Sequence, residues 1–126
     1  MTGELTWHLA RVDAQRMKVF ALLLGDPNPI HLDPDAVRRL GLGEAQINQG
    51  PSTMAMVYNL FAQTHPHHRV RRLTVRLLAN VFADQDVTVT ARPTGESGSY
   101  TVEIRTDGNA LVLQGHADLV ERTTSS

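Results

Sequence analysis

The feature that most limits the fold is the stretch 51–64, which leaves little polar surface when it is drawn as a helix. A helix that is apolar on most sides must be covered by other parts of the protein. The rest of the chain alternates apolar and polar residues, as strands with one buried face do. The alternating apolar positions are Leu73, Val75, Leu77, Ala79 and Val81, then Val87, Val89 and Ala91, then Tyr100, Val102 and Ile104, then Leu111, Leu113, Gly115, Ala117 and Leu119. These runs predict four strands after the apolar helix.

The part of the chain before the apolar helix predicts one strand and two helices. Apolar and polar residues alternate over 5–9, which indicates a half-buried first strand. Asp13 is a suitable N-cap for a helix that Gly25 would end. Asp33 is a suitable N-cap for a shorter helix that Gly41 would end. These signals are local, and each of them fixes one end of an element.

Together these elements predict an α+β protein, because the helices and the antiparallel strands are separated along the chain. We expect an antiparallel five-stranded sheet wrapped around a long central helix, which is the hot-dog arrangement. The length of 126 residues suits one core. We therefore predict a single domain over 1–126, with a frayed tail from about 122 onward.

Composition excludes several functions. The formal net charge of −1 argues against a general nucleic-acid binder, which needs a basic surface. The chain has no cysteine, so thiol nucleophiles, thiolate metal sites and disulfides are excluded. The longest apolar run, 19–24, is far too short to span a membrane. Since the N-terminus also shows no secretion signal, we expect a cytoplasmic protein without a membrane or nucleic-acid partner.

The strongest candidates for chemistry are Asp26 and His31, on a loop that contains Pro27 and Pro29. Proline fixes φ, so the loop can be stiff enough to aim a carboxylate and an imidazole at one point. Such a pair can bind a water molecule, remove one proton from it and supply another. Asn28 can hold the loop by bonding to its backbone. From the spacing alone, the more common interpretation is an ordinary helix end, a turn and a surface histidine, because Asp and His are frequent near turns.

The wider string resembles the signature of the MaoC-like dehydratases, the family of (R)-specific enoyl-CoA hydratases. Residues 25–31 match Gly-Asp-x-Asn-Pro-Ile-His at every fixed position, and Asp33 and Ala36 follow. Residues 47–50, Ile-Asn-Gln-Gly, stand before the apolar helix where the family has Ile-x-His-Gly. The order of the later strands also fits, so the resemblance covers nearly the whole chain.

The resemblance implies a hydro-lyase that acts on trans-2-enoyl thioesters, or on the (R)-3-hydroxyacyl product in reverse. The acyl group would be carried by coenzyme A or acyl carrier protein, with no other cofactor and no metal. Asp26 and His31 match the catalytic pair. One group of this pair activates the water that adds to C3, and the other supplies the proton to C2; the sequence does not assign which residue does which. Gly50 matches a glycine whose backbone N–H faces the thioester oxygen at a helix N-terminus. Its plainer interpretation is a glycine that starts the helix before Pro51.

Two departures from the family concern contacts to the substrate. Gln49 replaces the usual histidine, and Leu24 stands where a small hydroxyl residue is common. A serine found in some members aligns near Ala55, with Ser52 close by. The candidate oxyanion and substrate-binding residues are therefore Gly50, Asn28, Gln49 and Ser52.

Two further patterns have plain alternatives. His65, His67 and His68 could suggest a metal, but they lie in a turn with Pro66, which favours a solvated turn. A basic run in the following strand could contact coenzyme A phosphates or an acidic carrier, or form a solvated face; it comprises Arg69, Arg71, Arg72 and Arg76.

Two other functions are compatible with these residues. In a hot-dog thioesterase, the pair Asp26 and His31 would direct water at the thioester carbonyl instead of C3. In a heteromeric enzyme, the chain would be one of two related subunits. One sheet with one helix leaves an open edge, so we expect at least a homodimer.

Overall fold

The computed structural model describes residues 3–26 and 28–123. Pro27 of the loop and residues 124–126 of the predicted frayed tail lie outside this part of the chain. The elements are β1 (Leu5–Leu9), α1 (Ala14–Leu24), α2 (Pro34–Arg39), α3 (Gly50–Thr64), β2 (His68–Leu77), β3 (Val87–Pro93), β4 (Ser99–Thr106) and β5 (Ala110–Glu121). Two 3₁₀ turns, η1 (Pro29–His31) and η2 (Asp107–Asn109), complete them.

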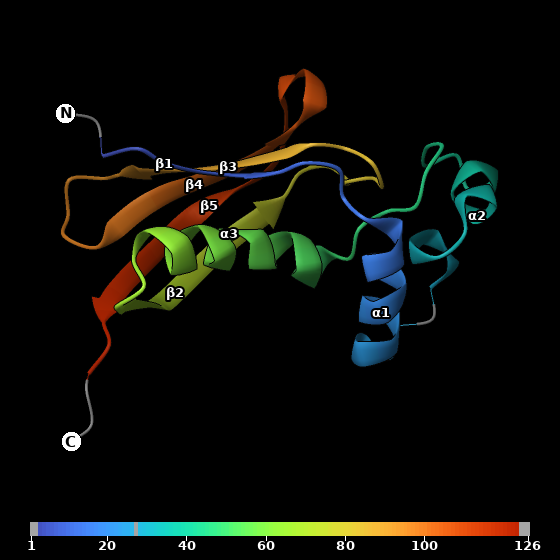
Figure 1. Ribbon diagram of the computed structural model, residues 1–126. Helices are drawn as coiled ribbons and strands as arrows, with labels where there is room; N and C mark the ends of the chain where they lie inside the picture. The colour runs from blue at the N-terminus through green and yellow to red at the C-terminus, as the bar shows by residue number, and fades with distance from the viewer. Residues whose placement is uncertain (1–2, 27, 124–126) are drawn as a thin grey trace.

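The five strands form one antiparallel sheet in the order β1-β3-β4-β5-β2. The long helix α3 lies on one face of this sheet (Figure 1). It contacts β1 at one edge of the sheet and β2 at the other, so the sheet curves around it. The α+β class and the five-stranded sheet with a central helix, both predicted above, are confirmed.

The core fills the space between α3 and the sheet. Alternation places one face of each strand toward the helix. Those side chains are buried in the central strands β3 and β4 and half-buried in the edge strands β1 and β2. The helix supplies Met56, Val57, Leu60 and Phe61, and the sheet supplies Val87, Val89, Ala91, Val102, Ile104, Leu113 and Ala117. Among the described residues, no helix is long and apolar enough to cross a membrane.

Strand β2 differs from its prediction at both ends. It begins at His68, well before Leu73, and it ends at Leu77, so Ala79 and Val81 lie beyond it. The early part escaped the pattern because a bulge between Val70 and Arg72 interrupts the alternation. Val81 is nevertheless buried, because the segment that follows β2 packs against the segment that leads into α3. The N–H of Asn48 donates to the carbonyl of Val81 at 2.7 Å.

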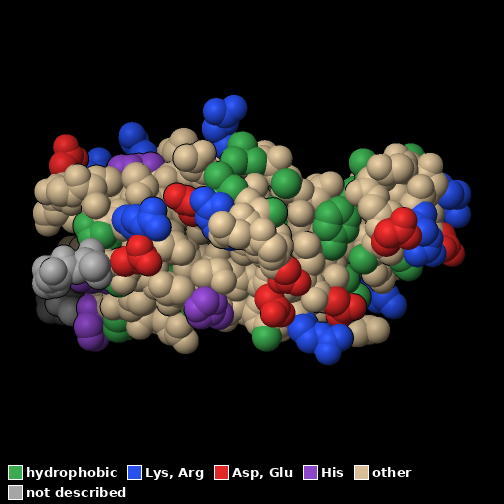
Figure 2. Space-filling view, turned by 90° about the horizontal axis from the view of Figure 1, so that it is seen from above, with side chains coloured by type: hydrophobic (Ala, Val, Ile, Leu, Met, Phe, Trp, Pro, Cys, Tyr) green, Lys and Arg blue, Asp and Glu red, His purple; other side chains and the backbone are tan. Residues whose placement is uncertain are grey.

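Helix α3 is less covered than its composition predicts. One face packs on the sheet, but Tyr58 on the opposite face is 45% exposed and Ala62 is also exposed. Helices α1 and α2 project from the sheet at one end of the molecule (Figure 1). In the space-filling view this projection is separated from the body by a constriction with hydrophobic side chains on its walls (Figure 2). On α1, Leu22 is 84% exposed.

Candidate active site

Asp26 is positioned by the end of α1. Gly25 adopts the left-handed conformation, with φ 62° and ψ 32°, which glycine reaches without steric cost. The N–H of Asp26 then bonds to the carbonyl of Ala21 at 2.9 Å, and that of Gly25 to Leu22 at 3.3 Å. This is a Schellman ending, which fixes the direction in which the chain leaves a helix. The carboxyl group of Asp26 is therefore held on a defined backbone.

Asn28 organises the loop that follows. Its backbone N–H donates to Oδ1 of Asp26 at 3.1 Å, and its side-chain oxygen accepts from the N–H of Ile30 at 3.2 Å. The second bond caps the turn η1, whose first residue is Pro29. Asn28 is exposed and lines neither of the hollows described below. It acts on the loop backbone, and through the loop it places both Asp26 and His31.

His31 is fixed from both sides of its ring. Nδ1 lies 2.7 Å from the carbonyl oxygen of Ile47, and Nε2 lies 3.2 Å from Oδ2 of Asp26. Because a carbonyl oxygen can only accept, Nδ1 carries the proton of that bond. Nε2 then faces a carboxyl oxygen, and the two atoms can share one proton. The side chain is well packed, since His31 is only 7% exposed.

The contact with Ile47 also brings His31 to the start of α3. The N–H of Ile47 bonds to the carbonyl of Ile30 at 2.8 Å, so the two segments are tied twice. Three residues later, Gly50 begins α3. His31 and Gly50 thus line one small cavity of about 170 Å³. A helix N-terminus carries unpaired N–H groups and a partial positive charge, so it can stabilise an anion in this cavity.

The space at Gly50 is tight. A Cβ atom added there would lie 3.2 Å from Cδ1 of Leu77. Asp26 lines a separate, open and mostly apolar groove of about 620 Å³ beside Leu22 and Leu32. The pair formed by Asp26 and His31 therefore sits between two hollows. The small cavity is lined by Gly50 at the N-terminus of α3, and the groove beside Asp26 opens to the surface.

The remaining predicted residues lie elsewhere. Gln49 is 1% exposed and does not line the cavity beside His31; its Nε2 donates to the carbonyl of Met17 at 2.8 Å. Its Oε1 is buried with no hydrogen-bond partner in the described part of the chain. Ser52 lines a different cavity, between β1, α1 and α3. The structure therefore brings together Asp26, His31 and Gly50, and it separates Gln49 and Ser52 from them.

Sequence reasoning missed two residues of the small cavity, Asn48 and Thr53. Both are buried, and Nδ2 of Asn48 donates to Oγ1 of Thr53 at 2.8 Å. The available signal was position, since Asn48 precedes Gly50 by two residues and Thr53 follows it by three. This hydrogen bond links the segment before α3 to the first turn of the helix.

Two of the histidines after α3, His65 and His68, take part in an aromatic cluster. Nε2 of His65 lies 3.2 Å from the hydroxyl of Tyr100, and the rings of Phe61 and His68 stand edge-on to His65. Burial, and then the neighbouring His68, lower the pKa of His65 from its ordinary value of 6.5. No group of three potential metal ligands occurs within residues 3–26 and 28–123. Arg72 and Arg76 lie exposed on the outer face of β2.

Comparisons with known proteins give the family and the fold of the chain. A family model described as "MaoC like domain" matches residues 5–112, which include both the loop and α3. An (R)-hydratase from A. caviae, described as involved in PHA biosynthesis, is 25% identical; the alignment covers 96% of each chain with a TM-score of 0.82. An R-hydratase from Pseudomonas aeruginosa is 18% identical, with 100% of this chain and 89% of that chain covered and a TM-score of 0.80.

A third similar structure is a chain of the ChsH1-ChsH2 complex from Mycobacterium tuberculosis. It is 18% identical, the alignment covers 96% of this chain and 97% of that chain, and the TM-score is 0.78. A comparison with curated protein sequences finds no match. The family model covers most of the chain, and the solved structures share its fold over nearly the whole length.

Proposed function

The chain belongs to the family of MaoC-like dehydratases, and from this premise we propose that it hydrates trans-2-enoyl thioesters to (R)-3-hydroxyacyl thioesters, or catalyses the reverse dehydration. One observation carries the proposal. The carboxyl group of Asp26 and Nε2 of His31 stand 3.2 Å apart beside the helix that begins at Gly50. An acid–base pair next to a helix N-terminus suits a reaction that moves protons while an anion develops nearby.

In the proposed reaction, Asp26 and His31 hold the attacking water. Its oxygen bonds to C3, and the electrons of the C2–C3 double bond move toward the thioester carbonyl. The pair accepts one proton from the water and a proton is delivered to C2, so the pair ends as it began. Nε2 is the nitrogen of His31 that can exchange this proton, because Nδ1 is engaged by Ile47.

Gly50 would stabilise the thioester oxygen. That oxygen gains negative charge as water adds, and the N–H of Gly50 at the N-terminus of α3 would stabilise this charge. Glycine has no side chain, so a thioester could approach its backbone closely. A Cβ atom added at Gly50 would lie 3.2 Å from Cδ1 of Leu77, so a larger residue would crowd this space. The carrier of the acyl group would be coenzyme A or acyl carrier protein.

The assay that tests this function uses two substrates of equal chain length. Crotonyl-CoA should lose its enoyl absorbance when the protein is added, and butyryl-CoA should release no free thiol. Release of thiol from butyryl-CoA without hydration of crotonyl-CoA would identify the protein as a thioesterase and not a hydratase. Inactivity toward both substrates, with hydration of crotonyl-CoA restored by a related second chain, would indicate a subunit of a heteromeric enzyme.

We also propose that the chain forms a homodimer. Strand β2 pairs only with β5 among the described strands, so its outer edge is open. The leucines of α1 beside Asp26 are exposed, with Leu22 at 84%. The ChsH1-ChsH2 structure is a complex of two chains, which makes a related partner the alternative. Sedimentation velocity of the purified chain distinguishes a dimer from a monomer.

A further inference from the structure

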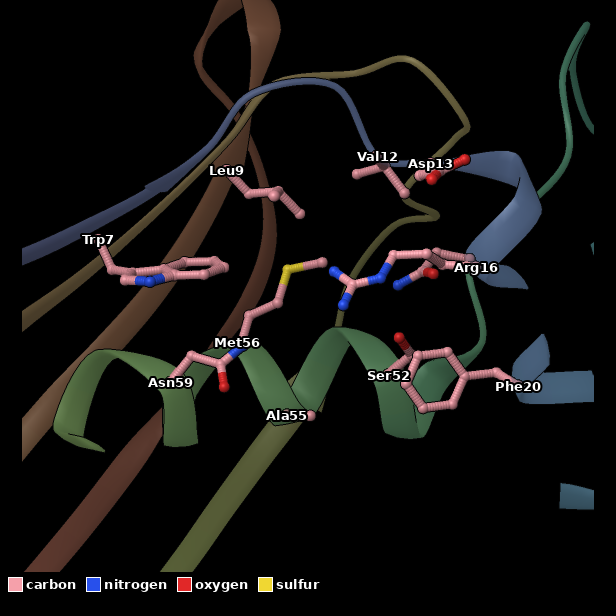
Figure 3. Close-up of a pocket in the computed structure, with 11 residues that line it drawn as sticks. Trp7, Leu9, Val12, Asp13, Arg16, Phe20, Ser52, Ala55, Met56 and Asn59 are labelled. Carbon is pink, nitrogen blue, oxygen red and sulfur yellow. The ribbon is translucent and has the colours of Figure 1, made fainter. Parts of the chain in front are cut away.

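A second cavity lies on the other side of α3 from His31. It measures about 290 Å³ and opens between β1, α1 and α3 (Figure 3). Its apolar walls come from all three elements, with Trp7 and Leu9 on β1, Phe20 on α1 and Met56 on α3. A water molecule in the liquid occupies about 30 Å³, so the cavity has room for roughly ten groups of that size. That is the size of a short alkyl chain with a polar end.

Arg16, an exposed residue of α1, adds a positive charge to the lining of this cavity. Its side chain extends from α1 across the cavity toward Met56 (Figure 3). Within residues 3–26 and 28–123, no carboxylate lies within ion-pair distance of its guanidinium. The acidic residue of the lining, Asp13, instead caps α1, with Oδ1 accepting from the N–H of Gln15 at 2.8 Å.

The chemistry of this lining selects the ligand. A guanidinium is always charged, and it can pair with an anion that enters the cavity beside it. Its planar donors match a carboxylate in two parallel hydrogen bonds. The carboxylate of Asp13 stands in the same lining and repels anions, so an ion with a single negative charge is disfavoured less than an ion with several. Ser52 and Asn59 add hydrogen-bonding groups on the α3 side.

We propose that this cavity binds an alkyl carboxylate. The apolar chain would lie against Trp7 and Met56, and the carboxylate would bond to Arg16. Two sources share this chemistry, the far end of a thioester substrate that carries a terminal carboxylate and a free fatty acid. The first source rests on the function proposed above. It requires the two cavities to adjoin, and Asn48 lines both this cavity and the one beside His31.

The binding test uses the intrinsic fluorescence of Trp7, which is the only tryptophan of the chain. Wild-type protein is titrated with hexanoate and with 1-hexanol. We expect a saturable change with hexanoate and at least about tenfold weaker binding of hexanol, because only the acid can pair with Arg16. Arg16→Gln should weaken hexanoate binding by about tenfold or more. The matched control is Arg39→Gln, which removes the same charge from α2 and should bind like wild type.

A second variant tests the cavity itself. Ala55→Leu enlarges a lining side chain on α3 while it keeps Arg16, and it should also weaken hexanoate binding. Circular dichroism checks that each variant folds. Hexanol binding as tightly as hexanoate, equal binding by Arg16→Gln and Arg39→Gln, or no saturable change in wild type would each overturn the proposal.

Enzyme kinetics then separate the two sources of the carboxylate. Two enoyl-CoA substrates of equal length are compared, one with a terminal carboxylate and one with a terminal methyl group. A KM that rises about tenfold in Arg16→Gln for the carboxylated substrate only assigns the cavity to the substrate's far end. If Arg16→Gln and wild type have the same KM for the carboxylated substrate, the cavity is assigned to a free acid. The fluorescence result stands even if the protein hydrates neither substrate, so failure of the two proposals is distinguishable.

Discussion

His31 donates through Nδ1 to the carbonyl oxygen of Ile47 at 2.7 Å, and this bond decides which ring nitrogen faces Asp26. The two residues are sixteen positions apart in the chain. Their contact joins the loop after α1 to the segment that leads into α3. Fixing one nitrogen of a histidine sets the tautomer and the ring orientation, which leaves the other nitrogen available for proton transfer.

The first prediction concerns His31→Asn. The amide can still donate to the carbonyl of Ile47, but it cannot exchange a proton as imidazole does. We expect the hydration rate to fall by about 10²- to 10⁴-fold. His31→Ala should lose as much activity and should also lower the free energy of unfolding, because it leaves a buried carbonyl unpaired. Steady-state kinetics and urea unfolding of both variants check this, and an active His31→Asn would contradict the assigned role.

The second prediction concerns Asn28, which supports the loop without lining either hollow. Asn28→Ala removes the oxygen that accepts from the N–H of Ile30. Loss of such a cap costs about 0.5–2 kcal/mol of folding free energy. The looser loop should also lower kcat, since the separation of Asp26 and His31 depends on it. Asn28→Ser keeps an accepting oxygen and should retain more of both quantities; equal losses in the two variants would exclude capping as the cause.

The third prediction separates packing from catalysis at Gly50. In Gly50→Ala the new Cβ meets the end of the flexible, exposed Leu77 side chain, which can move. We therefore expect the free energy of unfolding to change by less than about 1 kcal/mol. The methyl group would nevertheless push the thioester away from the head of α3, and kcat should fall by about 10- to 100-fold. Full activity in a folded Gly50→Ala would remove Gly50 from the proposed site.

The fourth prediction follows from the lowered pKa of His65. The unfolded chain binds a proton at higher pH than the folded chain does, so the stabilising contribution of neutral His65 is complete above its ordinary pKa of 6.5. It is lost as the pH falls through the lower, folded-state pKa. Urea unfolding between about pH 7.5 and about pH 5 should show a smaller loss of stability for His65→Gln than for wild type. Equal losses would show that His65 is not held neutral by its surroundings.

The parts of the fold that could be predicted from the sequence are those set by neighbouring residues. The caps of α1 and α2 at Asp13 and Asp33 depend on side chains that bond two residues onward, so they are visible in the sequence. The alternation of β3 to β5 is likewise local. The bulge of β2 between Val70 and Arg72 could not be predicted, because it depends on pairing with β5.

The site was predictable in its residue types and not in its contacts. Asp26 and His31 share a short loop, so their proximity follows from local structure. The bond from His31 to Ile47 and the bond from Gln49 to Met17 join distant segments, and only the fold reveals them. The position of Gln49 is the clearest example, since a polar residue next to Gly50 turns away from the cavity and ties α3 to α1.

The most direct test of the account is the hydration of crotonyl-CoA by wild type and by Asp26→Asn at saturating substrate. Asparagine keeps the size of Asp26 and the oxygen that accepts from Asn28, but it cannot accept the proton of water. The account predicts that wild type hydrates crotonyl-CoA and that kcat of Asp26→Asn is lower by about 10²- to 10⁴-fold, with unchanged secondary structure. Hydration at the wild-type rate by a folded Asp26→Asn protein would contradict the central claim.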